Sequence, residues 1–388
     1  MENNKVKMAI TAYVPGTMCN FRCKYCYISN CVDEHLEKPT YNYPLETMIK
    51  AFDPKRLKGI AEITVISGGE TLIDDTIVPF IHGLLKFGHV VTVVTNLTLN
   101  NRIDELLDIP EQYLKRLIVK GSLHWEELKR LNKIDDYFNN MNKVLKKGAS
   151  TYPFLVLSED YMPYLDEINN ICMERIGALP HCTPNIVFED KTLSHDGKIH
   201  TNPECTQEFV DKINNTFNSE IFKTSVKFLN VDVEKVFCYA GLWSFVVSLK
   251  DGSLFKCHNC PTENNFYENL EEMPELEAIG NNCQITNCAL QYNFLADGLI
   301  PEFEGIPTYG QMLARPRLIN EEVRNLLDVK FNEIHKEYNK KKQEKTSLKV
   351  QKLYKKLKQP KKTISFKNKV RLTIYNNLKH TLEKKGLI

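Results

Sequence analysis

Short runs of β-branched and other apolar residues recur along the first half of the chain, roughly every 30 residues, as they do where strands alternate with helices. Six runs predict strands, over residues 7–13, 61–66, 89–95, 116–121, 152–157 and 184–188. Apolar residues at helical spacing predict helices between them, among others over 134–147 and 163–176. Repeated strand–helix units form parallel sheets with right-handed crossovers, so this pattern predicts a parallel α/β core, open or partly closed into a barrel. Its ligand site would lie at the carboxyl ends of the strands.

The pattern changes near residue 189, where a polar stretch leads into a cysteine-rich region. The segment 243–257 alternates around Asp251-Gly252 and predicts a β-hairpin. After about residue 319 an apolar stripe at helical spacing predicts a helical region that ends at Pro360, and 365–385 reads as a basic amphipathic helix. We therefore expect three parts: a core over 1–195, a smaller cysteine-rich domain over 196–318, and a helical basic tail over 319–388.

Charge is distributed unevenly along the chain. Its 51 Lys and Arg and 49 Asp and Glu give a net charge of +2, but residues 330–388 hold 19 basic and 4 acidic side chains. A body of about −13 therefore precedes a tail of about +15. No apolar run is long enough to span a membrane and no secretory signal opens the chain, so the sequence predicts a cytoplasmic protein. In that compartment its twelve cysteines would stay reduced and available for metal binding.

Three cysteines lie within eight residues directly after the first predicted strand, in Cys19-Asn-Phe-Arg-Cys23-Lys-Tyr-Cys26. A structural zinc site needs four ligands, whereas three thiolates on a four-iron cluster leave one iron open to bind and activate a further molecule. The CxxxCxxC spacing, with the aromatic Tyr25 before the last cysteine, resembles the cluster loop of the radical S-adenosylmethionine (SAM) superfamily. The resemblance implies a SAM-binding 4Fe-4S cluster on Cys19, Cys23 and Cys26.

A second motif, Ser67-Gly68-Gly69-Glu70, follows the next predicted strand and opens a helix. Glycine in a strand-to-helix turn and an acid near a helix N-terminus also have ordinary structural uses. Its place on the loop after the cysteine motif, however, matches the superfamily's site for the amino group of SAM. The resemblance implies that Glu70 pairs with this ammonium group while the glycine backbone lies against the ligand.

Polar residues at the ends of the third and fourth predicted strands match the family pattern more loosely. By the same resemblance Asn96 and Ser122 would contact the ribose or carboxylate of SAM. Asn96 is equally suited to forming a turn and Ser122 to capping a helix. His124, next to Trp125, is expected to be a packed and hydrogen-bonded histidine, not a catalytic one.

A second cysteine set surrounds the predicted hairpin: Cys238 and Cys257 at its ends, then Cys260, Cys283 and Cys288. The spacing, with Gly252 four residues before Cys257, is similar to the auxiliary-cluster module of SPASM and Twitch radical SAM enzymes. It implies one auxiliary 4Fe-4S cluster on Cys238, Cys257, Cys283 and Cys288. Cys260 could replace Cys283 or Cys288, and a zinc site is the alternative. Four further cysteines stand singly and are expected to be structural: Cys31, Cys172, Cys182 and Cys205.

Together these resemblances imply a radical SAM enzyme with a partial (βα)6 TIM-like barrel, which cleaves SAM reductively and abstracts a substrate hydrogen. A fully ligated auxiliary cluster would accept an electron, which favours oxidation or dehydrogenation. The stretch 288–317 resembles proteins from bacterial polysaccharide gene clusters, so a carbohydrate or nucleotide-sugar substrate is expected, with a peptide side chain as the alternative. A flavodoxin or ferredoxin would supply electrons, and the basic tail could contact a membrane surface. A non-catalytic cluster protein that binds nucleic acid is disfavoured, because a binding module does not need Gly-Gly-Glu.

Overall fold

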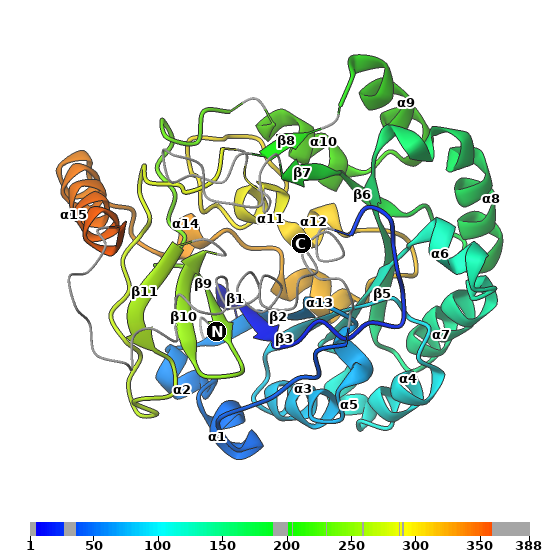
Figure 1. Cartoon of the computed structure of the whole chain (residues 1–388), viewed down its shortest axis with the longest axis horizontal. Helices are drawn as coiled ribbons and strands as arrows, with labels where there is room; N and C mark the ends of the chain where they lie inside the picture. Colours follow the sequence, from blue (N-terminus) through cyan, green and yellow to red (C-terminus); the bar gives the residue numbers. More distant parts are fainter. Residues whose placement is uncertain are drawn as a thin grey trace, which may run out of the picture. The chain divides into compact units, whose positions relative to one another are not determined.

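The computed structural model describes residues 5–26, 36–188, 201–203, 205–229, 231–257, 260–286, 288 and 291–358. By its internal contacts the chain divides into a large unit up to Ser347 and a second unit that begins at Leu348. The two are treated separately, and the fold below is that of the large unit (Figure 1). Among the described residues, no helix has the length and apolar character that crossing a bilayer would require.

A nine-stranded sheet with the order β11-β10-β9-β1-β2-β3-β4-β5-β6 forms the centre of this unit. Strands β1 to β6 pair in parallel in their sequence order, and β9 joins the other side of β1, again in parallel. The hairpin strands β10 and β11 continue the sheet in antiparallel pairing. The strands are β1 Val6–Val14, β2 Ile60–Ser67, β3 Val90–Thr95, β4 Leu117–Ser122, β5 Ser150–Leu157, β6 His181–Pro184, β9 Ser244–Ser248, β10 Ser253–Cys257 and β11 Cys260–Asn265. Strands β7 Ile186–Phe188 and β8 Thr201–Pro203 form a separate pair.

Helices cover the outer side of the parallel strands, where α3, α4, α7 and α8 follow one another around the sheet (Figure 1). The helices are α1 Leu45–Lys50, α2 Pro54–Leu57, α3 Ile77–Lys86, α4 Asn100–Leu107, α5 Glu111–Leu114, α6 Trp125–Arg130, α7 Ile134–Lys146, α8 Leu165–Ile176, α9 Gln207–Phe217, α10 Glu220–Phe228, α11 Gln291–Ala296, α12 Tyr309–Met312, α13 Glu321–Leu326, α14 Phe331–Ile334 and α15 Lys340–Lys358. Gly121 on β4 shows how closely this layer packs, because an added Cβ would lie 2.7 Å from the Tyr137 hydroxyl on α7.

The two faces of the parallel strands differ in exposure. Residues that face the helices, such as Ile63, Val65 and Val119, are fully buried. Alternate residues of the same strands face the other way, and several of these, including Ile66 and Val94, remain half-buried although they lie on central strands. This interior face is therefore not packed shut along its whole length. The architecture confirms the predicted partial (βα)6 barrel.

Five of the six predicted strands are confirmed within a few residues, and so are the helix at 134–147 and the hairpin around Gly252. The sixth prediction, 184–188, is confirmed as a strand over Ile186–Phe188 (β7), but this strand does not belong to the parallel sheet. The parallel strand is β6 at His181–Pro184, its pairing with β5 ends with the Asn185 N–H donating to the Leu157 carbonyl at 2.7 Å, and the chain then enters the separate pair β7–β8. The predicted helix at 163–176 begins with a short 3-10 turn, Glu159–Tyr164, before α8.

The region after residue 319 is helical, as predicted, but it consists of separate helices: α13, α14 and the start of α15. The chain breaks between α13 and α14 because its backbone groups bond to other segments. The Leu327 carbonyl accepts from the Gly310 N–H at 3.0 Å, and the Phe331 N–H donates to the Asp297 carbonyl at 2.7 Å. Pro360 and the predicted amphipathic helix at 365–385 lie outside the described residues.

Candidate active site

The loop that carries the first three cysteines leaves the carboxyl end of β1, as the sequence predicts. Its thiols lie close enough to interact electrostatically, since the charge of Cys26 raises the pKa of both Cys19 and Cys23. The Cys26 N–H donates to the Cys23 carbonyl at 3.1 Å, and the Phe21 N–H donates to the Cys19 Sγ at 3.4 Å. An N–H directed at a cysteine sulfur is one of the means by which a protein tunes a bound iron-sulfur cluster.

Burial keeps the Cys19 and Cys23 thiols protonated when no metal is bound. Desolvation raises the pKa of Cys19 to about 11, and it raises the pKa of Cys23 further, with the nearby Glu127 carboxylate adding to the effect. Metal ligation needs thiolates, so loading a metal centre here must release protons, and the positive charge of the metal must offset the desolvation.

The glycine motif at the end of β2 is held directly against this loop. The Glu70 N–H donates to the Met18 carbonyl at 2.9 Å. Gly69 leaves room for that approach, because an added Cβ would lie 2.0 Å from the same carbonyl oxygen. The Ser67 hydroxyl accepts from the Gly69 N–H at 3.1 Å and fixes the turn. The two motifs, about 40 residues apart in the chain, thus form one contiguous surface at the strand ends.

The Glu70 carboxylate turns inward, where only 3% of the residue is exposed. One oxygen accepts from the Leu72 N–H at 3.0 Å and from the Thr95 hydroxyl at 2.7 Å, and the other accepts from the Asn96 N–H at 2.8 Å. Burial raises the pKa of Glu70, and these three donors work against that rise. The acid caps the 3-10 helix Thr71–Ile73, which confirms that the motif opens a helix, and it joins the ends of β2 and β3.

Asn96 combines a turn with a link to the cysteine loop. Its side-chain oxygen accepts from the Thr98 N–H at 3.1 Å, as in an Asx turn, while its amide nitrogen donates to Asn20 at 2.8 Å. Ser122 is the last residue of β4 and half-buried. It does not cap the next helix, because His124 holds the N-cap position of α6.

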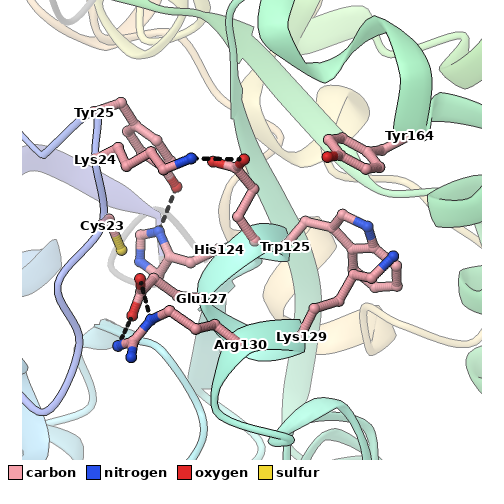
Figure 2. A pocket seen from close by; sticks show the side chains of 10 residues that line it. Cys23, Lys24, Tyr25, His124, Trp125, Glu127, Lys129, Arg130 and Tyr164 are labelled. Carbon is pink, nitrogen blue, oxygen red and sulfur yellow. Dashed lines mark hydrogen bonds and ion pairs between the residues drawn. The ribbon is translucent and has the colours of Figure 1, made fainter.

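His124 lies half-buried beside the cysteine loop and forms a short hydrogen bond to Tyr25, with 2.5 Å between the tyrosine oxygen and Nδ1 (Figure 2). Burial raises the pKa of the tyrosine and lowers that of the histidine to about 4, so both groups are neutral in this hydrogen bond. The expectation of a packed, hydrogen-bonded His124 is confirmed.

Glu127 fixes the same loop from the other side of His124. Its carboxylate accepts from the Arg22 N–H at 3.2 Å and pairs with the Arg130 guanidinium at 2.8 Å. That guanidinium holds the pKa of the Glu127 carboxyl below its usual range. The side chains shown in Figure 2 border a cavity of about 300 Å3 that reaches Cys23 from the α6 side. This link was missed from the sequence, because no local pattern connects residues 22 and 127.

The second cysteine set gathers around the hairpin, as predicted. Cys257 and Cys260 are register partners on β10 and β11, and Cys238 bridges to Gly280. Burial raises the pKa of Cys238 and of Cys257 well above the usual range, and the other members of the set add to this by their proximity. Cys260, Cys283 and Cys288 each raise the pKa of both thiols through their charge, so all three lie near them. Five cysteines, and not four, therefore share this region.

Gly252 adopts a left-handed backbone conformation in the hairpin turn, with φ of 73°. An added Cβ would meet the Asn265 side-chain oxygen at 2.5 Å, so both conformation and space require glycine there. Of the cysteines expected to be structural, Cys172 and Cys182 are fully buried, Cys205 is half-buried, and Cys31 lies outside the described residues.

The described residues contain no group of three or more Cys, His, Asp or Glu side chains already arranged around one metal ion. Cysteines that lie near one another, with backbone N–H groups close to their sulfurs, nevertheless have the chemistry that an iron-sulfur cluster needs.

A parallel barrel with three thiols at the end of its first strand, in contact with a Gly-Gly-Glu turn, brings together a site that suits a bound cofactor. Residues 13–157, from the end of β1 through β5 and including both loops, match the family model described as the Radical SAM superfamily. This part of the chain is a radical SAM domain, and the family uses a 4Fe-4S cluster and SAM.

Among solved structures, the chain is similar to Streptococcus suis SuiB bound to S-adenosylmethionine (13% identity, 69% of this chain and 65% of SuiB covered, TM-score 0.48). It is also similar to anSMEcpe with bound AdoMet (14%, 68% and 79%, TM-score 0.43) and to BtrN in complex with AdoMet and 2-DOIA (11%, 86% and 91%, TM-score 0.31). The chain spans slightly less than two thirds of the length of SuiB. No curated protein matches its sequence.

Proposed function

We propose that the enzyme cleaves SAM reductively and uses the radical that results to abstract a hydrogen atom from a substrate. The observation that carries the proposal is the contact between the two motifs, in which the Glu70 N–H holds the Met18 carbonyl beside Cys19. A 4Fe-4S cluster held by Cys19, Cys23 and Cys26 would supply one low-potential electron to SAM when bound.

The residues around this loop would fix the position of SAM. We assign the contacts to Tyr25, Ser67, Gly68, Gly69, Glu70, Asn96 and Ser122. Gly68 and Gly69 offer backbone that a ligand can approach closely. The Glu70 carboxylate already accepts three hydrogen bonds, so its first role is to position the ends of β2 and β3, and one remaining lone pair is available to an ammonium group.

We further propose a second 4Fe-4S cluster on Cys238, Cys257, Cys283 and Cys288, with Cys260 as the possible replacement for Cys283 or Cys288. Four thiolates would leave no iron open to substrate, and such a centre would accept an electron. This favours oxidation or dehydrogenation. Because β9–β11 continue the barrel sheet, the proposed boundaries at residues 195 and 318 do not separate two sheets. They separate the region that would hold the first cluster from the region that would hold the second.

For the substrate we propose a carbohydrate or nucleotide-sugar derivative, with a peptide side chain as the alternative. Oxidation of such an alcohol would remove one carbon-bound hydrogen atom, taken by the radical that SAM supplies, and the hydroxyl proton, taken by a base. A cluster held by the second thiol set would take up the one electron that remains. An external donor, a flavodoxin or ferredoxin, would reduce the first cluster.

With dithionite and SAM but no substrate, the anaerobically reconstituted enzyme should slowly release 5′-deoxyadenosine and methionine, because an open iron can bind and reduce the sulfonium. Chromatography of the quenched mixture measures both products. An intact, reducible cluster that yields neither product would contradict the proposal.

We propose that the segment 365–388 binds anionic membrane surfaces and is dispensable for SAM cleavage. Its apolar stripe and lysines motivate this, since each cation near such a surface contributes about 1 kcal/mol. The full-length protein should co-sediment with phosphatidylglycerol vesicles more than a chain that ends at Pro360. Equal partitioning of the two would refute membrane binding.

A further inference from the structure

Three ionisable side chains lie inside the barrel, away from the two loops just described. Glu62 on β2 and Asp297, which follows α11, are each 4% exposed. Lys120 on β4 lies near enough to Glu62 for their charges to interact. Among the described residues neither carboxylate accepts a hydrogen bond or forms an ion pair. Two buried carboxyl groups that accept no hydrogen bond among the described residues are costly, which suits a bound molecule that donates to them.

Lys120 is held in place by aromatic side chains. Its Nζ donates to the Tyr292 hydroxyl at 2.9 Å and lies 3.5 Å from the centre of the Phe154 ring. Tyr152 and Tyr309 close the same region with hydroxyl oxygens 3.0 Å apart. The aromatic groups fix the direction of the lysine, and its ammonium has further donors to offer.

Two unpartnered polar atoms also belong to this interior face. The Thr92 Oγ1 on β3 and the His181 Nε2 on β6 have no hydrogen-bond partner among the described residues, and both side chains are 1% exposed. His181 packs against Tyr152, with ring centres 5.4 Å apart. These atoms are independent of the carboxyl groups, and they too lack the partner that a bound molecule would supply.

We call Glu62, Lys120 and Asp297 the polar floor. Glu62 lies toward the end of the barrel opposite the first cysteine loop, whereas Lys120, the register neighbour of Val94, extends from two residues before the end of β4. The loop follows the carboxyl end of β1, whereas Glu62 stands five residues before the end of β2, roughly 16 Å lower. Between them the strands present half-buried residues: Thr64, Ile66, Val94 and Ser122. These four residues keep some exposed surface along the interior face.

The second cysteine set lies on the floor side. Strand β9 runs parallel to β1, so Cys238, which precedes β9, lies toward the amino ends of the barrel strands. Strand β10 is antiparallel, so Cys257 at its end lies on that side as well. Cys288 is only four residues before Tyr292, which bonds Lys120. A molecule above the floor would therefore lie between the two thiol sets.

We propose that Glu62, Lys120 and Asp297 bind the hydroxyl groups of a polyhydroxylated, carbohydrate-type substrate at the floor of the barrel. This assignment rests on the proposed function and names the residues that select its substrate. Each hydroxyl both donates and accepts, which matches carboxyl oxygens beside an ammonium group. The faces of Phe154 and Tyr292 suit the C–H faces of a sugar ring.

The charges at the floor fit this ligand. Burial raises the pKa of both carboxyl groups, and for Glu62 the nearby Asp297 raises it further. Two close carboxyl groups do not readily ionise together, so the pair can share one proton and offer both a donor and an acceptor. Burial lowers the pKa of Lys120 to about 7. A floor of small net charge suits a neutral polyol.

The test is saturation-transfer NMR on the full-length reconstituted enzyme, with glucose, galactose, N-acetylglucosamine, myo-inositol and the tripeptide Ala-Ser-Ala as separate probes. We expect transfer to at least one polyol, with roughly ten-fold weaker binding in Glu62→Gln and in Lys120→Met because a charge-assisted contact is lost. Glu111→Gln and Lys115→Met, at exposed positions, are the matched controls and should bind as the parent does.

Transfer to the tripeptide alone, to none of the probes, or equally in parent and floor variants would overturn the assignment. Thermal unfolding checks each variant, and Asp297→Asn replaces any that does not fold. SAM cleavage without substrate is measured in parallel on the parent and on the two control variants, Glu111→Gln and Lys115→Met, in which it should be unchanged. Loss of cleavage in the parent with polyol binding intact would reject the proposed function and leave the binding site standing.

Discussion

Replacing Cys19, Cys23 and Cys26 together by alanine should lower the iron of the anaerobically reconstituted protein from about eight to about four atoms per chain, with sulfide falling in parallel. Release of 5′-deoxyadenosine should fall below detection, because the remaining thiols cannot hold a cluster with an open iron at the end of β1. Iron and sulfide analysis, the visible absorption spectrum and product chromatography measure the three effects.

The matched control is Cys172→Ala, which removes a buried thiol on α8 that belongs to neither set. It should lose some stability, while iron and cleavage remain those of the parent. About one zinc per parent chain with little iron would reject the cluster assignment for both sets.

Glu70→Ala should have the second largest effect, acting on stability and on SAM together. It leaves the Leu72 and Asn96 N–H groups and the Thr95 hydroxyl without their acceptor, at about 1–3 kcal/mol for each group that stays buried and unpaired. SAM affinity should fall roughly ten-fold to a hundred-fold, because the Gly-Gly turn loses its anchor and the ligand loses a charged contact. Urea unfolding and calorimetric titration of SAM measure the two quantities.

Glu70→Gln separates the two roles. It keeps the size of the side chain and one acceptor oxygen, so it should recover part of the stability while SAM binding stays weak if the carboxylate contacts the ammonium group. Unchanged stability and unchanged SAM affinity in Glu70→Ala would contradict both roles.

The parallel core could be predicted from the sequence because its strands are continuous β-branched runs, as in β3, where every residue is valine or threonine. The hairpin could be predicted because Asp251-Gly252 marks its turn. The sixth strand could not be placed, since one apolar run covers the end of β6 and all of β7, and nothing local indicates that the pairing partner changes between them.

The cysteine loop and the Gly-Gly-Glu turn could be recognised because each is local in sequence. Their support could not, because it consists of contacts between distant segments, such as Glu127 with Arg22 and Asn96 with Asn20. The polar floor could not be predicted from the sequence for a related reason. Glu62 interrupts an otherwise apolar strand as a single acid, and nothing local indicates that Lys120 and Asp297 come to the same place.

One continuous sheet connects the strand before the first cysteine loop with the hairpin that carries Cys257 and Cys260. Neighbouring strands are held about 4.8 Å apart by their hydrogen-bond ladders, so β1 and β10, with β9 between them, are separated by a backbone lattice that stretches little. In the proposed two-cluster enzyme, this lattice would fix the distance between the strand that precedes the first cysteine loop and the hairpin that carries Cys257 and Cys260, and that distance would change little as substrates enter and leave. Substrate would then control the timing of electron transfer through its own redox state, without any movement of the protein that brings the two centres together.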